Sequence, residues 1–247
     1  MNSSPTSIYT FDFENLFCNI PLEDLYVTLM KIYDSFYIGV ELGIDRSFFD
    51  SLCHYCIFNN FVTFNNFTFK QIHGIGMGTN YSSTAANLYL FYYEFNYTVK
   101  YNKRISIFRY IDDILVFNKN MEEEFKLVYP QTLQLNKANE EIDSANFLDI
   151  SFKIRDSQLS TDLYDKKEHF NFHAKCMPHW FSNLHKKIFI NIIIGQLCRF
   201  FKICNDKKHF NKQVYKFIAG LYYQNNYPAE FIFYYLNLFN KSFRQNR

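Results

Sequence analysis

Residues 105–117 read ISIFRYIDDILVF, in which two apolar runs flank the adjacent acidic residues Asp112 and Asp113. Both runs have the composition of buried strands, so the segment predicts a hairpin with the two aspartates in its turn or at the edge of the turn. Turns favour aspartate, and this preference alone explains many such pairs. Buried flanking strands, however, bring two adjacent charges to the border of a core, where they are costly unless they are paired or bound to a metal ion.

A third acidic residue lies on a strand near the N-terminus. Residues 7–14 alternate, with Tyr9, Phe11 and Phe13 on one side and Asp12 on the other. This period of two predicts a strand and places Asp12 on the face away from the aromatic core. We therefore take Asp12 as a candidate to act together with the aspartate pair.

A glycine-rich loop, QIHGIGMGTN at residues 71–80, leads into an expected helix that contains Ala85 and Leu88. Backbone N–H groups ahead of a helix can meet a phosphate or a flat base. The spacing of Gly74, Gly76 and Gly78 matches neither the P-loop nor the dinucleotide fingerprint, so the loop alone is a weak signal.

The rest of the chain predicts an α+β fold without linkers or repeats. Residues 61–69 predict a hairpin that turns at Asn65-Asn66, two residues that tolerate positive φ. Cys53 and Cys56 lack a second pair at zinc-finger spacing, so core thiols are a simpler explanation for them than a metal or redox site. Strands are expected near residues 146–154 and 159–164, and helices near 21–32, 47–58, 184–201, 210–224 and 228–239, with another beginning at Glu122 to Glu124. The expected fold is an antiparallel sheet backed by helices, with an all-helical C-terminal region.

Composition bounds the class of protein. The 247 residues are 48% hydrophobic and 20% charged, which excludes an intrinsically disordered chain. The longest apolar run, residues 188–198, is shorter than the roughly 20 residues that a bilayer span needs, so no membrane is expected as a partner. Residues 1–5 lack the basic region and apolar run of a signal peptide. We therefore expect an intracellular protein, in the nucleus or the cytoplasm.

Charge is divided unevenly along the chain. Residues 1–150 hold 10 Lys+Arg and 18 Asp+Glu, a formal charge of −8, whereas residues 151–247 hold 16 Lys+Arg and 6 Asp+Glu, a formal charge of +10. This division is expected if the first part of the chain binds cations and the second part binds a polyanion. An ordinary solvated helical surface would give it too.

The acidic strand residue, the glycine loop and the aspartate hairpin together are the parts that two-metal phosphoryl transfer requires. Two Mg²⁺ ions lie roughly 3.5–4 Å apart in such sites and need hard oxygen ligands. Carboxylates from two different strands can bridge them. An unrelated metal-dependent transferase could use an Asp-Asp pair in the same way, but it would not explain the other motifs.

Five segments, taken in order, match the motifs of one enzyme family. TFDFENLFCNIP at residues 10–21 has an aspartate ahead of a run of the form SLFTNIP, and residues 71–90 and FRYIDD at 108–113 follow as the glycine-rich motif and the polymerase aspartate hairpin. NFLDISF at 146–152 and LSTDLYDK at 159–166 are similar to the segments that lead to the primer grip and thumb. The series resembles reverse transcriptases, most closely those of Penelope-like retroelements, over residues 7–240. The resemblance implies a palm at residues 1–165 and a thumb-like helical region at 166–247.

The resemblance also implies roles for individual residues. Asp12, Asp112 and Asp113 would be the catalytic aspartates and would hold Mg²⁺ or Mn²⁺. Phe17 falls where the family keeps an aromatic residue that screens the 2′ position of the incoming sugar, and Met77 and Gly78 would lie beside the nascent base pair. A core aromatic is the alternative for Phe17, and a gap-filling core residue is the alternative for Met77. Lys166 and Lys167, with the later basic helices, would contact the nucleic-acid backbone.

The implied function is that of an RNA-directed DNA polymerase of retroelement origin. Its partners would be an RNA or DNA template with a DNA primer and deoxynucleoside triphosphates, and the sequence leaves the oligomeric state open. The sequence differs from the family pattern in two ways, which leave an alternative function open. The loop reads MGTNYSS from Met77, where many relatives read MGSPLSP. The fingers region that precedes the first aspartate in the family is missing ahead of Asp12. The alternative is a catalytically inactive, truncated remnant that binds nucleic acid or only folds.

Overall fold

The computed structural model describes residues 4–36, 43–103, 105–170 and 177–243, and it divides into two compact units. One unit comprises residues 7–142, and the other comprises residues 143–247 with the N-terminal residues 1–6. The strands between residues 144 and 163, which the sequence places in the palm, fall in the second unit. The division into a palm at 1–165 and a thumb at 166–247 stays a prediction about function.

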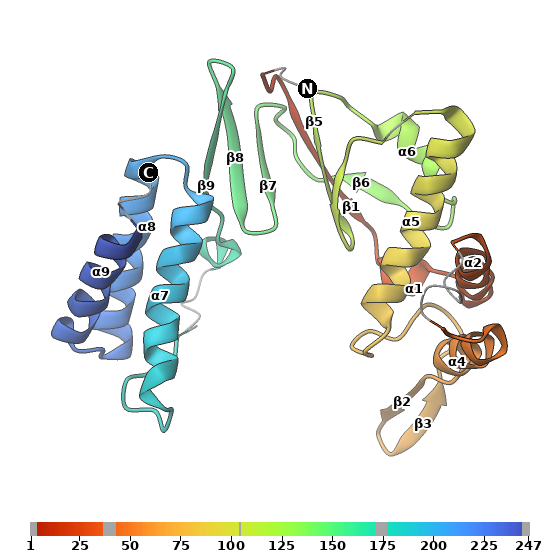
Figure 1. Ribbon diagram of the computed structural model, residues 1–247, viewed down its shortest axis with the longest axis horizontal. Helices are drawn as coiled ribbons and strands as arrows, with labels where there is room; N and C mark the ends of the chain where they lie inside the picture. The colour runs from red at the N-terminus through yellow and green to blue at the C-terminus, as the bar shows by residue number, and fades with distance from the viewer. Residues whose placement is uncertain (1–3, 37–42, 104, 171–176, 244–247) are drawn as a thin grey trace. The chain divides into compact units, whose positions relative to one another are not determined.

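A four-stranded antiparallel sheet is the centre of the first unit (Figure 1). Its order is β4-β5-β1-β6, with bounds Phe108–Tyr110 for β4, Asp113–Phe117 for β5, Ile8–Phe13 for β1 and Leu135–Lys137 for β6. The predicted exposure of Asp12 between the buried Phe11 and Phe13 is confirmed, but Ile8 and Thr10, which share the face of Asp12, are buried as well. The predicted aspartate hairpin is confirmed as well, because β4 and β5 are joined by a two-residue turn.

Helices pack on the aromatic face of this sheet. They are α1 (Leu16–Asn19), α2 (Leu22–Ser35), α4 (Arg46–Phe58), α5 (Ser82–Tyr101) and α6 (Glu122–Val128). The ring of Phe11 meets Phe125 edge to face at a centroid distance of 5.0 Å, and both belong to a core that includes Tyr89 and Ile114. Burial raises the pKa of the Cys53 thiol to about 11, as expected for a structural rather than a reactive cysteine.

The predicted hairpin at residues 61–69 forms as a separate two-stranded sheet of β2 (Phe61–Phe64) and β3 (Phe67–Lys70). Asn65 and Asn66 have φ values of 47° and 64°, the positive pair that a type I′ turn needs. Thr63 and Thr68 are cross-strand partners, as the sequence predicts.

The second unit combines a three-stranded antiparallel sheet with helices (Figure 1). Its elements are β7 (Ser144–Phe147), β8 (Ile150–Arg155), β9 (Gln158–Leu163), the 3₁₀ turn η1 (Lys166–His169), α7 (Lys186–Ile203), α8 (Lys207–Ala219), the π-helical segment η2 (Gly220–Gln224) and α9 (Ala229–Phe243). The single strand expected over residues 146–154 is wrong, because the chain turns at Leu148, where φ is 54°. The expected α+β class and the helical C-terminal region are confirmed. In the described ranges no helix is long and apolar enough to cross a membrane.

Candidate active site

Asp12 and Asp113 are direct cross-strand partners in the antiparallel pair β1·β5. Partners of this kind project to the same face of a sheet, with Cβ atoms roughly 4.5–5.5 Å apart. Asp12 is also opposite Asn136 on β6, and Asp113 is opposite Tyr110 on β4. Tyr110, Asp113, Asp12 and Asn136 therefore form one row across all four strands, on the face away from the helices.

Asp112 occupies the turn between β4 and β5, immediately beside this row. Its carbonyl oxygen accepts a hydrogen bond from the N–H of Phe13 at 3.2 Å, which ties the turn to the end of β1. Ile111, the other turn residue, has a φ of 55°. A β-branched residue rarely adopts positive φ, and such strain costs about 1–3 kcal/mol and is concentrated at functional sites. The structure thus brings all three predicted aspartates to one end of the sheet.

Arg109, at the centre of β4, anchors the aspartate hairpin to helix α5. Its Nε atom lies 2.6 Å from Oε1 of Glu94, and its NH1 atom lies 2.7 Å from Oδ1 of Asn87 and 3.4 Å from the carbonyl oxygen of Ile111. The hydroxyl of Tyr129 donates to Glu94 Oε1 at 2.8 Å, and burial, followed by the Glu94 charge, raises the pKa of Tyr129 well above its usual value. The network fixes the strand that leads into the strained turn.

Sequence reasoning missed this network, although the sequence contains a signal for it. Arg109 lies within an apolar strand, and Glu94 is the one acidic residue of the helix at residues 82–101, next to a run of aromatic residues. Charged residues in buried runs need partners. Two such residues of opposite charge, in elements expected to pack together, could have been paired from the sequence.

The glycine-rich loop packs directly against helix α1, two residues beyond β1. A Cβ atom added at Gly74 would lie 2.6 Å from the Cα atom of Cys18 and 2.6 Å from the carbonyl oxygen of Phe17, and Gly74 has a φ of +67°. The N–H of Ile75 donates to the same Phe17 oxygen at 2.7 Å. Only glycine fits this contact, so the loop is held against the segment that follows Asp12.

The structure also places the remaining predicted residues. Phe17 is half-buried and packs against the core cluster of the first unit, and its backbone holds the glycine loop. Met77 is 74% exposed, which excludes the gap-filling core residue considered for it. Gly78 has a φ of +87° and no atom within 4 Å of an added Cβ, so it lies open to solvent beside Met77. Whether Phe17, Met77 and Gly78 contact a nucleotide stays a prediction.

The residues present suit a hard divalent cation. Asp12 and Asp113 offer two carboxylates on neighbouring strands, and protein sites typically hold Mg²⁺ through one or two carboxylates together with substrate phosphates. Among the described residues, no group of three or more His, Cys, Asp and Glu side chains is arranged to hold a metal by itself. A metal at this sheet end would be held by these two carboxylates, with water or substrate phosphates as its other ligands.

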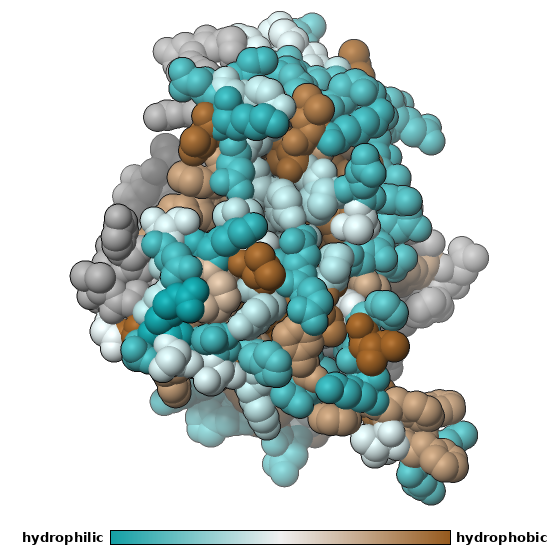
Figure 2. Space-filling view, turned by 90° about the vertical axis from the view of Figure 1, so that its right-hand side faces the viewer, coloured by the Kyte–Doolittle hydropathy of each residue, from teal (hydrophilic) through white to brown (hydrophobic). Residues whose placement is uncertain are grey.

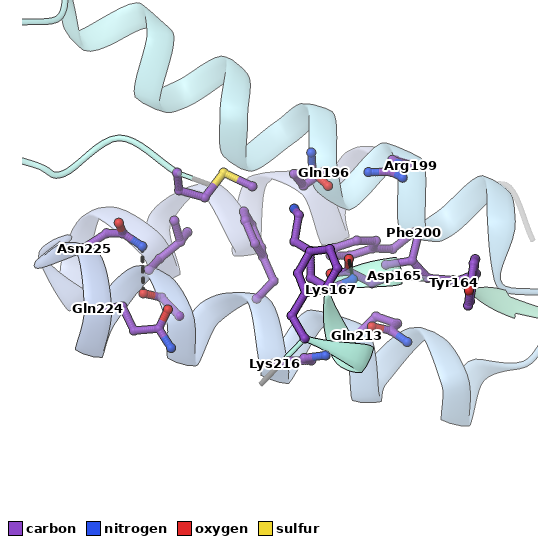
Figure 3. Close-up of a pocket in the computed structure, with 16 residues that line it drawn as sticks. Tyr164, Asp165, Lys167, Gln196, Arg199, Phe200, Gln213, Lys216, Gln224 and Asn225 are labelled. Carbon is purple, nitrogen blue, oxygen red and sulfur yellow. Dashed lines mark hydrogen bonds between the residues drawn. The ribbon is translucent and has the colours of Figure 1, made fainter. Parts of the chain in front are cut away.

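The second unit contains a pocket of about 620 Å³ between β9, η1, α7 and α8 (Figure 3). Lys167, Arg199 and Lys216 line it, together with aromatic and amide side chains. Arg199 pairs with Asp149 at 2.6 Å, and Gln213 donates to Asp162 at 3.1 Å, so part of its polar lining is engaged within the unit. The predicted contact residue Lys167 lies on its wall.

Comparison with known structures identifies the fold. The chain is similar to telomerase from Candida albicans, solved in complex with a TWJ fragment of telomeric RNA, with 9% identity and a TM-score of 0.59 over 97% of this chain. Telomerase from Candida tropicalis aligns less well, with a TM-score of 0.49 at 12% identity for the apo structure and 0.47 at 13% for the RNA complex, covering 96% and 99% of this chain. The chain spans 45%, 46% and 39% of the three telomerase chains in that order. The fold is thus similar to that of the Candida albicans telomerase.

Sequence comparison adds one further match. Residues 176–237 match the family model described as an animal helix-turn-helix domain, a region that contains α7, α8 and most of α9. The match covers less than half of the chain and concerns the second unit alone. No curated protein matches the chain.

Proposed function

We propose that this chain is the polymerase domain of an RNA-directed DNA polymerase, in which Asp12, Asp112 and Asp113 hold Mg²⁺ or Mn²⁺. The observation that carries the proposal is the register of β1 and β5, which pairs Asp12 with Asp113 beside the Asp112 turn in a telomerase-like fold. Residues separated by a hundred positions meet on one accessible sheet face, as the two-metal chemistry requires. A remnant that only folds would not need this arrangement.

In this proposal the chain's own residues position the reacting groups. Asp12 and Asp113 would hold the metal ions from adjacent strands, and Asp112 would complete the set from the turn. The ions, when bound, lower the pKa of the primer 3′-hydroxyl and neutralise charge on the triphosphate. Phe17, which follows β1 and supports the glycine loop, would restrict the space at the sugar 2′ position and favour deoxynucleotides.

The proposed substrates are an RNA or DNA template with a DNA primer, and deoxynucleoside triphosphates. The net charge of +10 over residues 151–247 supports contact with the nucleic-acid backbone in the second unit. The motif order, above all TFDFENLFCNIP at residues 10–21, supports an origin in Penelope-like retroelements. The helix-turn-helix match within residues 176–237 is compatible with a nucleic-acid partner for the helices of this unit.

Primer extension on poly(rA)/oligo(dT) with Mg²⁺ or Mn²⁺ tests the proposal. Asp112→Asn should abolish extension while leaving the melting temperature near that of the wild type, because the change is isosteric and the turn is not buried. Asp34→Asn, an acidic residue of α2 outside the site, is the matched control and should extend primers at the wild-type rate. Extension by Asp112→Asn at the wild-type rate would remove Asp112 from the metal site.

The assay also separates the proposal from its alternative, a nucleic-acid-binding remnant without activity. The wild-type chain should be tested alone and within any longer reading frame that contains it, on RNA and DNA templates. Binding of a primer-template duplex without extension in every form would favour the remnant.

A further inference from the structure

The hairpin of β2 and β3 exposes an unusual amount of aromatic surface. Cross-strand register places Val62, Phe64, Phe67 and Phe69 on one face, and these side chains are 56%, 69%, 69% and 55% exposed. In Figure 2 apolar side chains gather on the projection at the lower right, at the level of this hairpin. A two-stranded hairpin is only marginally stable by itself, so an uncovered face of this kind indicates a binding surface.

The base of the hairpin is held firmly and adjoins both ends of the glycine-rich loop. The Asn60 side chain donates to the carbonyl oxygens of Cys56 and Ile57 at 3.1 and 3.2 Å and to the hydroxyl of Tyr81 at 2.7 Å. The N–H of Gln71 donates to the Asn60 carbonyl oxygen at 2.9 Å. Asn60 therefore joins the end of α4, both ends of the hairpin and the end of the glycine loop.

The charge of this region does not oppose the binding of a polyanion. Residues 51–93 contain no Asp or Glu, although the chain as a whole has 24. The same stretch carries Lys70 and His73, and Lys70 lies on the second face of the hairpin with Phe61, Thr63 and Thr68. A hairpin with exposed rings on one face and a cation on the other, without acidic residues nearby in the sequence, has the composition of a single-strand nucleic-acid surface.

We propose that the β2–β3 hairpin is a stacking platform for unpaired bases of the template strand. This inference rests on the proposed function, since it names the surface that would hold the single-stranded part of that enzyme's nucleic acid. Phe64, Phe67 and Phe69 stack on bases, and Lys70, on the other face of the hairpin, adds positive charge close to the bound strand. The Asn60 junction connects the platform to the glycine loop, so a strand bound on the hairpin continues toward the aspartate row.

Ring-specific substitutions test the platform by fluorescence anisotropy with a labelled twelve-nucleotide oligo(rU). Phe64→Ala with Phe67→Ala should weaken binding by roughly 10- to 100-fold, which is the range expected for one to two lost stacking contacts. Phe64→Leu with Phe67→Leu should weaken it nearly as much, because leucine keeps the apolar surface but lacks a ring. Phe64→Tyr with Phe67→Trp should restore it. Phe181→Ala, an exposed phenylalanine of the second unit, is the control and should bind as the wild type does.

Two outcomes would overturn the platform. Unchanged oligo(rU) affinity in the alanine pair is one, provided that the variant melts as the wild type does. The other is a leucine pair that binds like the wild type, together with a dimer in sedimentation that the alanine pair abolishes, since the face would then cover a second copy of the chain. Asp112→Asn should keep full oligo(rU) binding, so loss of extension and loss of the platform are separate results.

Discussion

Arg109 and Glu94 form a forked ion pair beneath the aspartate turn, with Nε 2.6 Å from Oε1 and NH2 3.3 Å from Oε2. Their side chains are only 11% and 18% exposed. The pair connects the strand that ends in the turn to the helix that follows the glycine loop. The pair therefore positions the aspartates through contacts within the protein, and this role can be tested separately from metal or substrate binding.

Glu94→Ala should destabilise the protein by about 3 kcal/mol, because it leaves the guanidinium of Arg109 largely buried without its carboxylate. The hydroxyl of Tyr129 loses its acceptor in the same variant. Urea unfolding measures the change in the free energy of unfolding. Arg109→Lys keeps the charge but not the fork, and it should lower kcat for primer extension more than it raises KM, as expected for a residue that positions the turn.

A second ion pair of the same geometry provides the control. Arg46 and Asp34 are joined by contacts of 2.8 and 3.0 Å, but their side chains are 56% and 52% exposed. Arg46→Ala should cost no more than about 1 kcal/mol, because an exposed pair is screened by water. Equal losses of unfolding free energy in Glu94→Ala and Arg46→Ala would mean that burial does not strengthen the Arg109–Glu94 pair.

Gly74→Ala should unfold or strongly destabilise the first unit. The added Cβ would lie 2.6 Å from backbone atoms of Phe17 and Cys18, which cannot move without displacing α1. Gly78→Ala, where φ is also positive but the space is open, should cost only the roughly 1 kcal/mol of backbone strain. Comparing the melting temperatures of the two variants separates the loss of stability caused by the steric clash from the loss caused by backbone strain. If Gly74→Ala melted at the same temperature as Gly78→Ala, the result would contradict the packing of the loop on α1.

Helix α7 offers a third glycine for the same comparison. Gly195 is exposed, lies within the helix and has no atom within 4 Å of an added Cβ. Gly195→Ala should stabilise the second unit by roughly 0.5–1 kcal/mol, because alanine loses less backbone entropy in a helix. A destabilised Gly195→Ala variant would show that something covers this face of α7.

Alternation and turn chemistry made the end of the sheet that holds the three aspartates predictable. The exposure of Asp12 between the buried Phe11 and Phe13 followed from the period of two, and the turn at Ile111-Asp112 followed from the apolar runs on either side of it. Pairing of Asp12 with Asp113 came from family resemblance rather than from periodicity, because register between distant strands leaves no local mark in the sequence.

The wrong predictions concern features for which the local sequence carries no signal. The apolar alternation of residues 146–154 continues across a turn at Leu148, a residue that rarely adopts positive φ, so two strands were taken for one. The expected helix over residues 210–224 is α-helical only to Ala219 and then widens into a π-helical segment, which spacing does not reveal. Both features arise from tertiary packing that overrides the local signal.

Divalent cations should stabilise the fold through Asp12, because the proposed metal site includes its carboxylate. A ligand that binds only the folded state adds about 1.4 kcal/mol at ten times its Kd, so thermal melting in 10 mM Mg²⁺ or Mn²⁺ should rise for the wild type and for Asp34→Asn. Asp12→Asn should lose most of this rise, because the cross-strand carboxylate pair becomes a single carboxylate. The measurement needs neither primer nor nucleotide. Equal shifts in Asp12→Asn and the wild type would place the bound cation elsewhere.

Alkaline pH should destabilise the protein through its buried tyrosines. Burial and then a hydrogen bond to Asp24 raise the pKa of Tyr93 to about 12, and burial raises the pKa of Tyr227 to about 12. The unfolded chain loses these protons near pH 10 while the folded protein keeps them, so their contribution is complete below pH 10 and is lost as the pH rises toward 12. Urea midpoints between pH 8 and 11.5 measure this slope, which Tyr227→Phe should reduce.

The hydroxyl of Tyr227 is buried without a hydrogen-bond partner among the described residues, so Tyr227→Phe should also stabilise the protein by roughly 1 kcal/mol at pH 8. Tyr93→Phe should instead destabilise it there, because Asp24 loses a donor, and a stabilised Tyr93→Phe variant would contradict the hydrogen bond.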